Sequence, residues 1–290
     1  MASFKIYTYQ FSPAIEDEIM TETLFGMAPV TSDSVMLDKQ TVFQTLFSDG
    51  SGFAFSKGLT KYNHQVILNE NGIIVLRIAN NKKLRQEENF KIKELVNQPS
   101  CVVVIDNRGD CQSMAIQDKS RAFVSTDQVA KIMTASLNEA LKASGLVVEI
   151  RRRIEENTFW NLLDRYPEGV RSIRFEIAYP NLPRVSDNVD ALFRSVCKEL
   201  GATSSFQLNA IQGQTLNLSK SSELLSGLVK ASSESGHPIK VLPAEKNARW
   251  VSTGTDSSVS SEMNDKLFSM EETLFHDRFD QIARNMNKFK

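Results

Sequence analysis

The chain has 290 residues, of which 41% are hydrophobic and 24% charged, and its formal net charge is -1 at pH 7. This is the composition of an ordinary soluble chain, and its length allows one large or two modest hydrophobic cores. The balanced charge excludes a whole-molecule attraction to nucleic acid or to anionic membranes, so either kind of binding would need a local basic patch.

The cysteine content and the N-terminus both bear on the compartment. Three cysteines do not make a disulfide framework, which indicates a reducing environment. The first residues, MASFKIYTYQFSP, lack the apolar stretch of a secretory signal, and no later run has the apolar length that crosses a bilayer. We therefore expect a cytoplasmic protein that does not contact membranes.

The first elements are a strand and a short helix. Residues 4–11 alternate in the manner of a strand, which Pro13 ends, and residues 41–47 fit a short helix. Further on, Asn71-Gly72 precedes an apolar strand at 73–79, and this turn type predicts a hairpin with residues 66–68. The charged stretch 80–94 that follows is either a solvated connection or a binding surface.

A second hairpin, at residues 101–117, has the clearest local pattern. Residues 101–106 are apolar and β-branched, and Asn107-Arg108-Gly109-Asp110 predicts the turn after them. A turn centred on Arg108-Gly109 sets Val103 opposite Met114 and Cys101 opposite Ile116. Cys111 then lies on the other face of the hairpin, away from Cys101.

A capped helix follows this hairpin. Ser125 and Gln128 fit a capping box, and apolar residues recur at helical spacing until Gly145 ends the run. We expect the helix at 126–144 to cover one face of the sheet. That face is formed by Val103, Ile105, Met114 and Ile116.

After Gly145 the pattern becomes an alternation of strands and helices. Strands are expected at 147–154, 170–179, 204–211 and 238–242, and helices at 155–165, 186–200 and 221–235. The serine-rich stretch 252–262 is typical of a loop, and 263–289 fits one long helix with an apolar stripe. Such a stripe either closes its own core or packs across a two-fold axis, and we expect a homodimer.

The predicted fold class is α+β, with a mixed sheet and hairpins in the N-terminal half, strand-helix alternation in the C-terminal half and a long C-terminal helix. Two domains are expected. Residues 1–145 would form an N-terminal α/β domain around the central hairpin, and residues 146–290 a C-terminal α/β domain with the closing helix.

Motifs that carry catalysis or hold a cofactor are not found. His64, His237 and His276 are isolated, and no pair of histidines or cysteines has the spacing of a metal site. The chain also lacks a phosphate-binding glycine loop before a helix and a Gly-x-Ser-x-Gly nucleophile motif. We therefore expect no metal, no cofactor and no catalytic residue.

One alternative is a divergent metal-dependent nuclease that uses Asp106, Gln117 and Lys119. Such enzymes need an acid at a strand end and a following acid-x-Lys pair that converge on a divalent cation. In the register above, Asp106 faces Cys111, and Lys119 lies eight residues further along, about 26 Å at the rise of a strand. The three residues converge only if the hairpin has a different register, and Gln117 stands where an acid is usual.

Positive charge gathers in a few places. Lys82, Lys83 and Arg85 follow one predicted strand, Arg151-Arg152-Arg153 occupy another, and Arg171 and Arg174 lie on a third. Arg151 and Arg153 share one face of their strand. These arginines either pair with Glu149, Glu155, Glu156 and Glu176 or contact phosphate. If the chain binds nucleic acid, the site is expected at Arg151 and Arg153, with Lys82, Lys83 and Arg85 in support.

In layout the chain resembles the RexA-like phage-exclusion proteins and related proteins of bacterial phage-defence loci. The resemblance rests on an N-terminal strand, a middle hairpin with the run Pro-x-Cys-Val-Val-Val-Ile-Asp-Asn-Arg at 99–108, a helix, a late α/β half and a C-terminal helix. It implies dimerisation and sequence-independent DNA binding without a catalytic centre, and it assigns no individual site residue.

The expected function is therefore that of a non-enzymatic phage-defence or mobile-element accessory protein. It would self-associate and bind nucleic acid without sequence specificity, or bind a partner protein. A nuclease and a pure protein-interaction subunit are the alternatives.

Overall fold

The computed structural model describes residues 1–14, 19–23, 26–30, 36–88, 90–109, 111–177, 204–254, 258–268 and 275–289. They belong to two compact units, one made of Met1–Ile150 with Ser260–Lys290 and the other of Arg151–Val259. The chain leaves the first unit once and returns to it, because β17 (Ser260–Met263) pairs with β1 (Ala2–Pro13). The sequence instead places the division between residues 145 and 146 and assigns this closing segment to the second domain.

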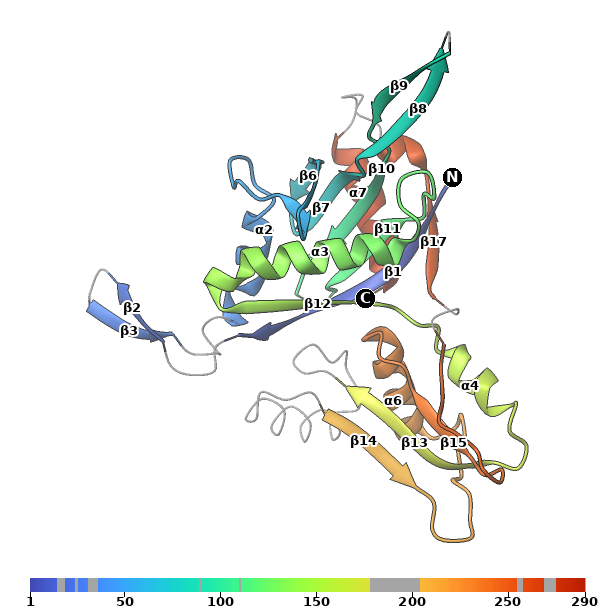
Figure 1. Cartoon of the computed structure of the whole chain (residues 1–290). Helices are drawn as coiled ribbons and strands as arrows, with labels where there is room; N and C mark the ends of the chain where they lie inside the picture. Colours follow the sequence, from blue (N-terminus) through green and yellow to red (C-terminus); the bar gives the residue numbers. More distant parts are fainter. Residues whose placement is uncertain are drawn as a thin grey trace. The chain divides into compact units, whose positions relative to one another are not determined.

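The first unit is built on a seven-stranded sheet in the order β12-β1-β11-β10-β7-β6, with β17 added beside β1 (Figure 1). Its other strands are β6 (His64–Glu70), β7 (Ile73–Ala79), β10 (Ser100–Asp106), β11 (Ser113–Gln117) and β12 (Leu146–Arg152). Its helices are α2 (Lys39–Thr45), α3 (Thr126–Leu141) and α7 (Phe275–Met286), with 3-10 turns at Lys142–Ser144, Asp265–Phe268 and Asn287–Phe289. Figure 1 shows α3 across one face of this sheet and α7 on the other.

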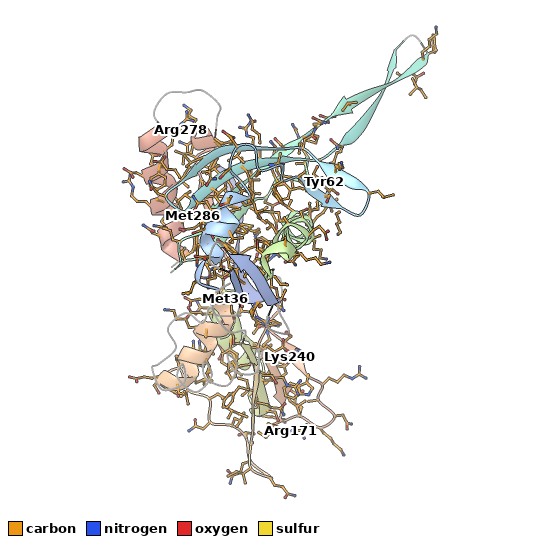
Figure 2. All side chains as sticks on the ribbon, turned by 90° about the vertical axis from the view of Figure 1, so that its left-hand side faces the viewer. Met36, Tyr62, Arg171, Lys240, Arg278 and Met286 are labelled. Atoms are coloured by element: carbon orange, nitrogen blue, oxygen red, sulfur yellow. The ribbon has the colours of Figure 1, made fainter. Side chains whose placement is uncertain are left out.

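Among the described strands of the first unit, three hairpins pair with no strand outside themselves. They are β2 (Ile19–Thr23) with β3 (Gly26–Val30), β4 (Phe55–Lys57) with β5 (Thr60–Tyr62), and β8 (Lys82–Glu88) with β9 (Lys91–Asn97). The third occupies the charged stretch that follows β7, and we call β8 and β9 the arm. In Figures 1 and 2 the arm extends away from the main sheet.

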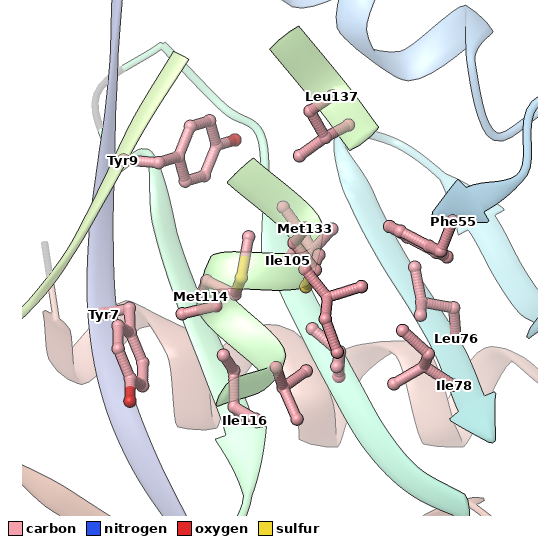
Figure 3. Close-up of a cluster of buried hydrophobic side chains, with 14 of the residues drawn as sticks. Tyr7, Tyr9, Phe55, Leu76, Ile78, Ile105, Met114, Ile116, Met133 and Leu137 are labelled. Carbon is pink, nitrogen blue, oxygen red and sulfur yellow. The ribbon is translucent and has the colours of Figure 1, made fainter. Parts of the chain in front are cut away.

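The core of the first unit lies between α3 and the sheet, as predicted. Val103, Ile105, Met114 and Ile116 are fully buried and pack in one cluster with the apolar stripe of α3 (Figure 3). That stripe consists of Val129, Ile132, Met133, Leu137 and Leu141. The β-branched strand and the helical spacing thus meet on the faces that their periodicities indicate.

The cap that begins α3 is confirmed, with one difference. The Ser125 side chain accepts a hydrogen bond from the backbone N–H of Gln128 at 3.3 Å. The Gln128 side chain reaches back to the N–H of Val124, at 3.1 Å, rather than to that of Ser125. Gly145 adopts a left-handed conformation after the last turn, with φ of 64°, so the predicted stop is also confirmed.

The register of the central hairpin differs from the predicted one by two residues. Val103 lies opposite Ile116 and Ile105 opposite Met114, so the buried face is unchanged. The turn is longer because the N–H groups of Cys111 and Gln112 both donate to the carbonyl of Arg108. Gln112 has a positive φ of 43°, which is uncommon for residues other than glycine and is not predicted by a glutamine in the sequence.

The hairpin predicted at Asn71-Gly72 is confirmed, since β6 pairs with β7. Both turn residues have positive φ, 48° and 80°, as this turn type requires. The carbonyl of Gly72 also accepts a hydrogen bond from the N–H of Asn107 at 2.6 Å. This turn therefore packs against the turn that follows β10.

The prediction of a long C-terminal helix is wrong. Residues 260–263 form β17, residues 265–268 form a 3-10 turn, and α7 has only 12 residues. The serine-rich stretch before it is not all loop either, because pairing with β1 draws part of it into the sheet. The described apolar residues of α7 close the core of their own unit, and Ile282 and Met286 are buried there. Among the described residues, no helix has the length and apolar character of a membrane span.

The second unit is a four-stranded antiparallel sheet in the order β14-β13-β15-β16. Its strands are β13 (Val170–Ile177), β14 (Ser204–Asn209), β15 (Lys240–Pro243) and β16 (Val251–Ser252), and its helices α4 (Asn157–Leu163) and α6 (Glu223–Glu234). Ile173, Phe175 and Val241 pack with both helices in one cluster. The helix predicted at 186–200 lies outside the described residues. With helices beside mixed and antiparallel sheets, the fold is α+β.

Candidate nucleic-acid interface

The three residues of the nuclease alternative do not converge. Asp106 ends β10 opposite Ser113 and is fully buried, and Arg108 pairs with its carboxylate. Gln117 lies four residues beyond Ser113, about 13 Å along the strand. Its side-chain oxygen accepts a hydrogen bond from the backbone N–H of Val102 at 3.0 Å. Lys119 follows the end of β11 and is exposed. The arrangement stabilises a hairpin end.

The buried phenol and thiol near Asp106 have raised pKa values, which disfavour their reactive, deprotonated forms. The Tyr9 hydroxyl donates to the side chain of Asn107 at 2.9 Å, and burial raises the pKa of this phenol well above its usual range. Burial also raises the pKa of the Cys111 thiol to about 12, with the Asp106 charge adding to the effect. A nucleophile or a general base needs the opposite shift, because only the deprotonated form attacks or accepts a proton.

Histidines and acids do not make a metal centre in the described part of the chain, where no three His, Cys, Asp or Glu side chains gather. The ring of His64 packs edge-on against Phe53 and Phe55, and burial lowers the pKa of its imidazole. His237 is 3% exposed in the second unit. The side chain of His276 lies outside the described residues.

The predicted basic cluster at Lys82, Lys83 and Arg85 lies on β8 of the arm. The Lys82 ammonium donates to the carbonyl of Arg121 at 2.7 Å. In the backbone register Arg85 stands opposite Glu94 and Lys83 opposite Val96. The side chains of Lys83 and Arg85 themselves lie outside the described part.

The second predicted cluster, Arg151 and Arg153, is engaged within the protein. The guanidinium of Arg153 donates to the carboxylate of Glu234 at 2.9 Å, and the two side chains are 14% and 9% exposed. Glu234 is not among the glutamates expected from the sequence, because it comes from α6, 81 residues away. Arg151 is half-buried at the end of β12. A buried, paired arginine is not available to phosphate.

The structure instead gathers polar and cationic groups on the outer face of the second unit's sheet, opposite the face that carries Ile173 and Val241. We call this surface the open face. It is formed by Arg174 of β13, Gln207 and Asn209 of β14, Lys240 of β15 and Trp250, which precedes β16. The strand period of two puts the first four on one side, because Arg174 stands opposite both Gln207 and Lys240.

Contacts hold the open face in order. The guanidinium of Arg174 donates to the Gln207 side chain at 2.7 Å and lies 5.0 Å from the centre of the Trp250 ring. The Gln207 amide in turn donates to Asn209 at 2.8 Å. Trp250 remains 39% exposed, so an aromatic ring beside a cation is presented to solvent on this side.

The charge of the open face is positive on balance. Lys240 pairs with Glu176 at 2.7 Å, and the hydrogen bond from Lys240 lowers the pKa of that carboxyl. Arg174 donates a hydrogen bond to the neutral side chain of Gln207, and this contact does not offset its positive charge. The connection from β15 to β16 carries exposed Lys246 and Arg249 together with exposed Glu245. Figure 2 labels Lys240 of β15 and Arg171, which lies near the start of β13.

Sequence reasoning identified Arg174 as basic but missed the open face. The alternation Ser172, Arg174, Glu176 against Ile173 and Phe175 contained the signal, since it marks a strand with one wet side. Trp250 gave no signal, because it lies outside any periodic run. The chain matches no protein-family model and no curated protein.

Proposed function

We propose that the chain is a non-enzymatic protein that binds nucleic acid without sequence specificity, through the open face of its second unit, and that self-associates. Its setting would be bacterial phage defence or a mobile element, as the layout of the chain implies. The observation that carries the proposal is the exposed ring of Trp250 beside the guanidinium of Arg174 on a sheet with helices behind it.

This combination suits a nucleic-acid strand for two reasons. Exposed aromatic rings on a sheet stack with unpaired bases of any sequence, and neighbouring cations contact the phosphates. The amides of Gln207 and Asn209 can donate to sugar or phosphate oxygens and add no charge preference. We therefore expect single strands to bind more tightly than duplexes, since paired bases do not expose their faces.

Tryptophan fluorescence tests the proposal directly, because the chain has only two tryptophans and Trp160 is buried. Titration of a mixed-sequence single strand at low salt should quench the emission, and added salt should reverse the quenching steeply. The quenching should persist in Trp160→Phe and disappear in Trp250→Phe.

Affinity is measured in parallel by anisotropy of a labelled strand. Trp250→Ala should weaken binding by about tenfold, a loss within the range of one stacked base. Arg174→Glu should weaken it further and lower the salt dependence, whereas Lys131→Glu, an equal charge change at an exposed position of α3, should not. If the wild type neither quenches nor retards any strand, the open face does not bind nucleic acid and the partner-protein alternative stands.

A further inference from the structure

The arm is built in a way that calls for a partner strand. Its two strands pair with each other over seven residues and with no other described strand. Two-stranded ribbons are marginally stable alone, and both of their edges present unpaired backbone groups. The arm also exposes apolar side chains, with Phe90 98%, Ile92 70% and Val96 79% accessible.

The sequence of β8 has opposite charge at its two ends. It reads Lys-Lys-Leu-Arg-Gln-Glu-Glu from Lys82 to Glu88. A strand that pairs with a second copy of itself must run antiparallel across a two-fold axis. The positive end of each copy then meets the negative end of the other, so β8 is complementary to itself.

We propose that β8 pairs with β8 of a second copy of this chain and that the two arms form one four-stranded ribbon across a two-fold axis. This inference deepens the self-association in the proposed function and rests on it. The register that matches most charges places Arg85 at the axis. Lys83 then stands opposite Glu87 of the partner copy and Lys82 opposite Glu88, each pair occurring twice.

The pairing inside each arm is compatible with this register. Arg85, which meets its own copy at the axis, stands opposite Glu94 of its own β9, so each arginine has an acid on its other side. Lys83 and Glu87 stand opposite Val96 and Ile92 in their own arm. In the backbone register of the arm the residues opposite these two are therefore apolar, whereas the register across the axis sets Lys83 and Glu87 opposite each other.

The outer strand β9 is less suited to self-pairing. It reads Lys-Ile-Lys-Glu-Leu-Val-Asn, and the register centred on Glu94 sets two acids against each other and matches no opposite charges. A shift by one residue matches only Lys93 with Glu94. Cross-strand pairs of opposite charge stabilise a sheet and like pairs destabilise it. The β8 register also sets Arg85 against its own copy, but it gains four pairs of opposite charge, so the β8 edge is the better interface.

Charge reversal at Lys83 and Glu87 tests the register with the full-length protein in sedimentation velocity. The wild type should move at micromolar concentration as a particle larger than the 32.6 kDa of one chain. Lys83→Glu alone and Glu87→Lys alone should each raise the dissociation constant at least about tenfold, because two attractive pairs become repulsive. A mixture of the two single variants should associate again, and so should the double variant.

The outcomes separate the register from the rest of the proposal. A wild type that stays a single chain overturns self-association itself. If the wild type associates and either single variant associates just as tightly, only the β8 register is overturned, and the association must use another surface. Trp250→Ala should leave sedimentation unchanged while it weakens strand binding, so a failure of nucleic-acid binding does not affect this test.

Discussion

Arg153 and Glu234 form a buried ion pair of 2.9 Å between the segment after β12 and the end of α6. Burial raises the pKa of the Glu234 carboxyl, and the charge of Arg153 opposes that rise. Removing Arg153 leaves the carboxylate of Glu234 with only the ammonium of Lys230, which is 3.9 Å away and 57% exposed. A buried charge that loses its close partner is far costlier than the loss of an exposed pair. The pair is therefore a structural lock within the second unit.

We expect Arg153→Met to lower the free energy of unfolding by about 3 kcal/mol at pH 7. Without the arginine, the pKa of Glu234 rises further, and a carboxyl whose pKa is raised by folding gains stability as pH falls toward its unfolded value. The loss should therefore shrink between pH 7 and pH 5. Urea unfolding at both values measures it.

The matched control is the double variant Arg153→Met with Glu234→Gln, which removes both charges. It should recover most of the lost stability and show no such change with pH. Equal losses for the single and double variants would mean that the charge of Glu234 is already compensated by other groups.

A carboxylate placed under α3 should unfold the first unit. Val103→Asp puts an unpaired charge where the side chain is fully buried among apolar neighbours, and we expect a loss of about 4 kcal/mol. Thermal melting monitored by circular dichroism measures the loss. Val147→Asp, the same change on β12 where the side chain is 39% exposed, should cost less than about 1 kcal/mol. Similar melting temperatures for the two variants would contradict the packing of this layer.

Alanine at Gly72 should cost more than alanine at Gly50. Both glycines have a φ near 80°, but an added Cβ at Gly72 would lie 2.8 Å from Cγ of Arg108, whereas Gly50 has open space. Arg108 cannot move freely because it pairs with buried Asp106. Backbone strain alone predicts about 1 kcal/mol for Gly50→Ala, and the added clash about 3 kcal/mol for Gly72→Ala. Denaturant midpoints at unchanged slope would compare them.

The thiols of Cys101 and Cys111 should resist labelling at neutral pH. Burial raises the pKa of each to about 12, so almost none of the reactive thiolate forms at pH 7. In a Cys197→Ser variant, a thiol reagent should label the native protein slowly and label two groups at once after denaturation. Fast labelling of the native variant would show that the first unit opens near these residues.

Local patterns predicted those parts of the fold that local chemistry determines. The capped helix α3, the Asn-Gly hairpin and the buried face of the central hairpin follow from residues a few positions apart, and all are found. The predicted register of the central hairpin was wrong because Gln112 adopts a backbone conformation that is usual for glycine. The prediction of one long helix for the closing segment was wrong. Its apolar residues fit a helix, but its first part pairs with a strand about 260 residues away in the sequence.

The site was less accessible to prediction for the same reason. Charge clusters can be read from the sequence, but their partners cannot, and Glu234 reaches Arg153 only through the packing of α6. Likewise Arg174 and Trp250 become neighbours only when β13, β15 and β16 lie side by side. A run of basic residues therefore does not show which of them are exposed, since adjacency along the chain is a poor guide to exposure.

The pairing of β1 with β17 also constrains the order of events during synthesis. The first strand leaves the ribosome at once, yet its partner at Ser260–Met263 is made only after the whole second unit, which is inserted between β12 and β17. Arg151–Val259 can therefore fold while the first sheet still lacks a strand. During this interval the edge of β1 at Ala2–Lys5, where β17 pairs, is unprotected. A nascent chain of this protein is therefore exposed to edge-to-edge aggregation until the last stage of translation.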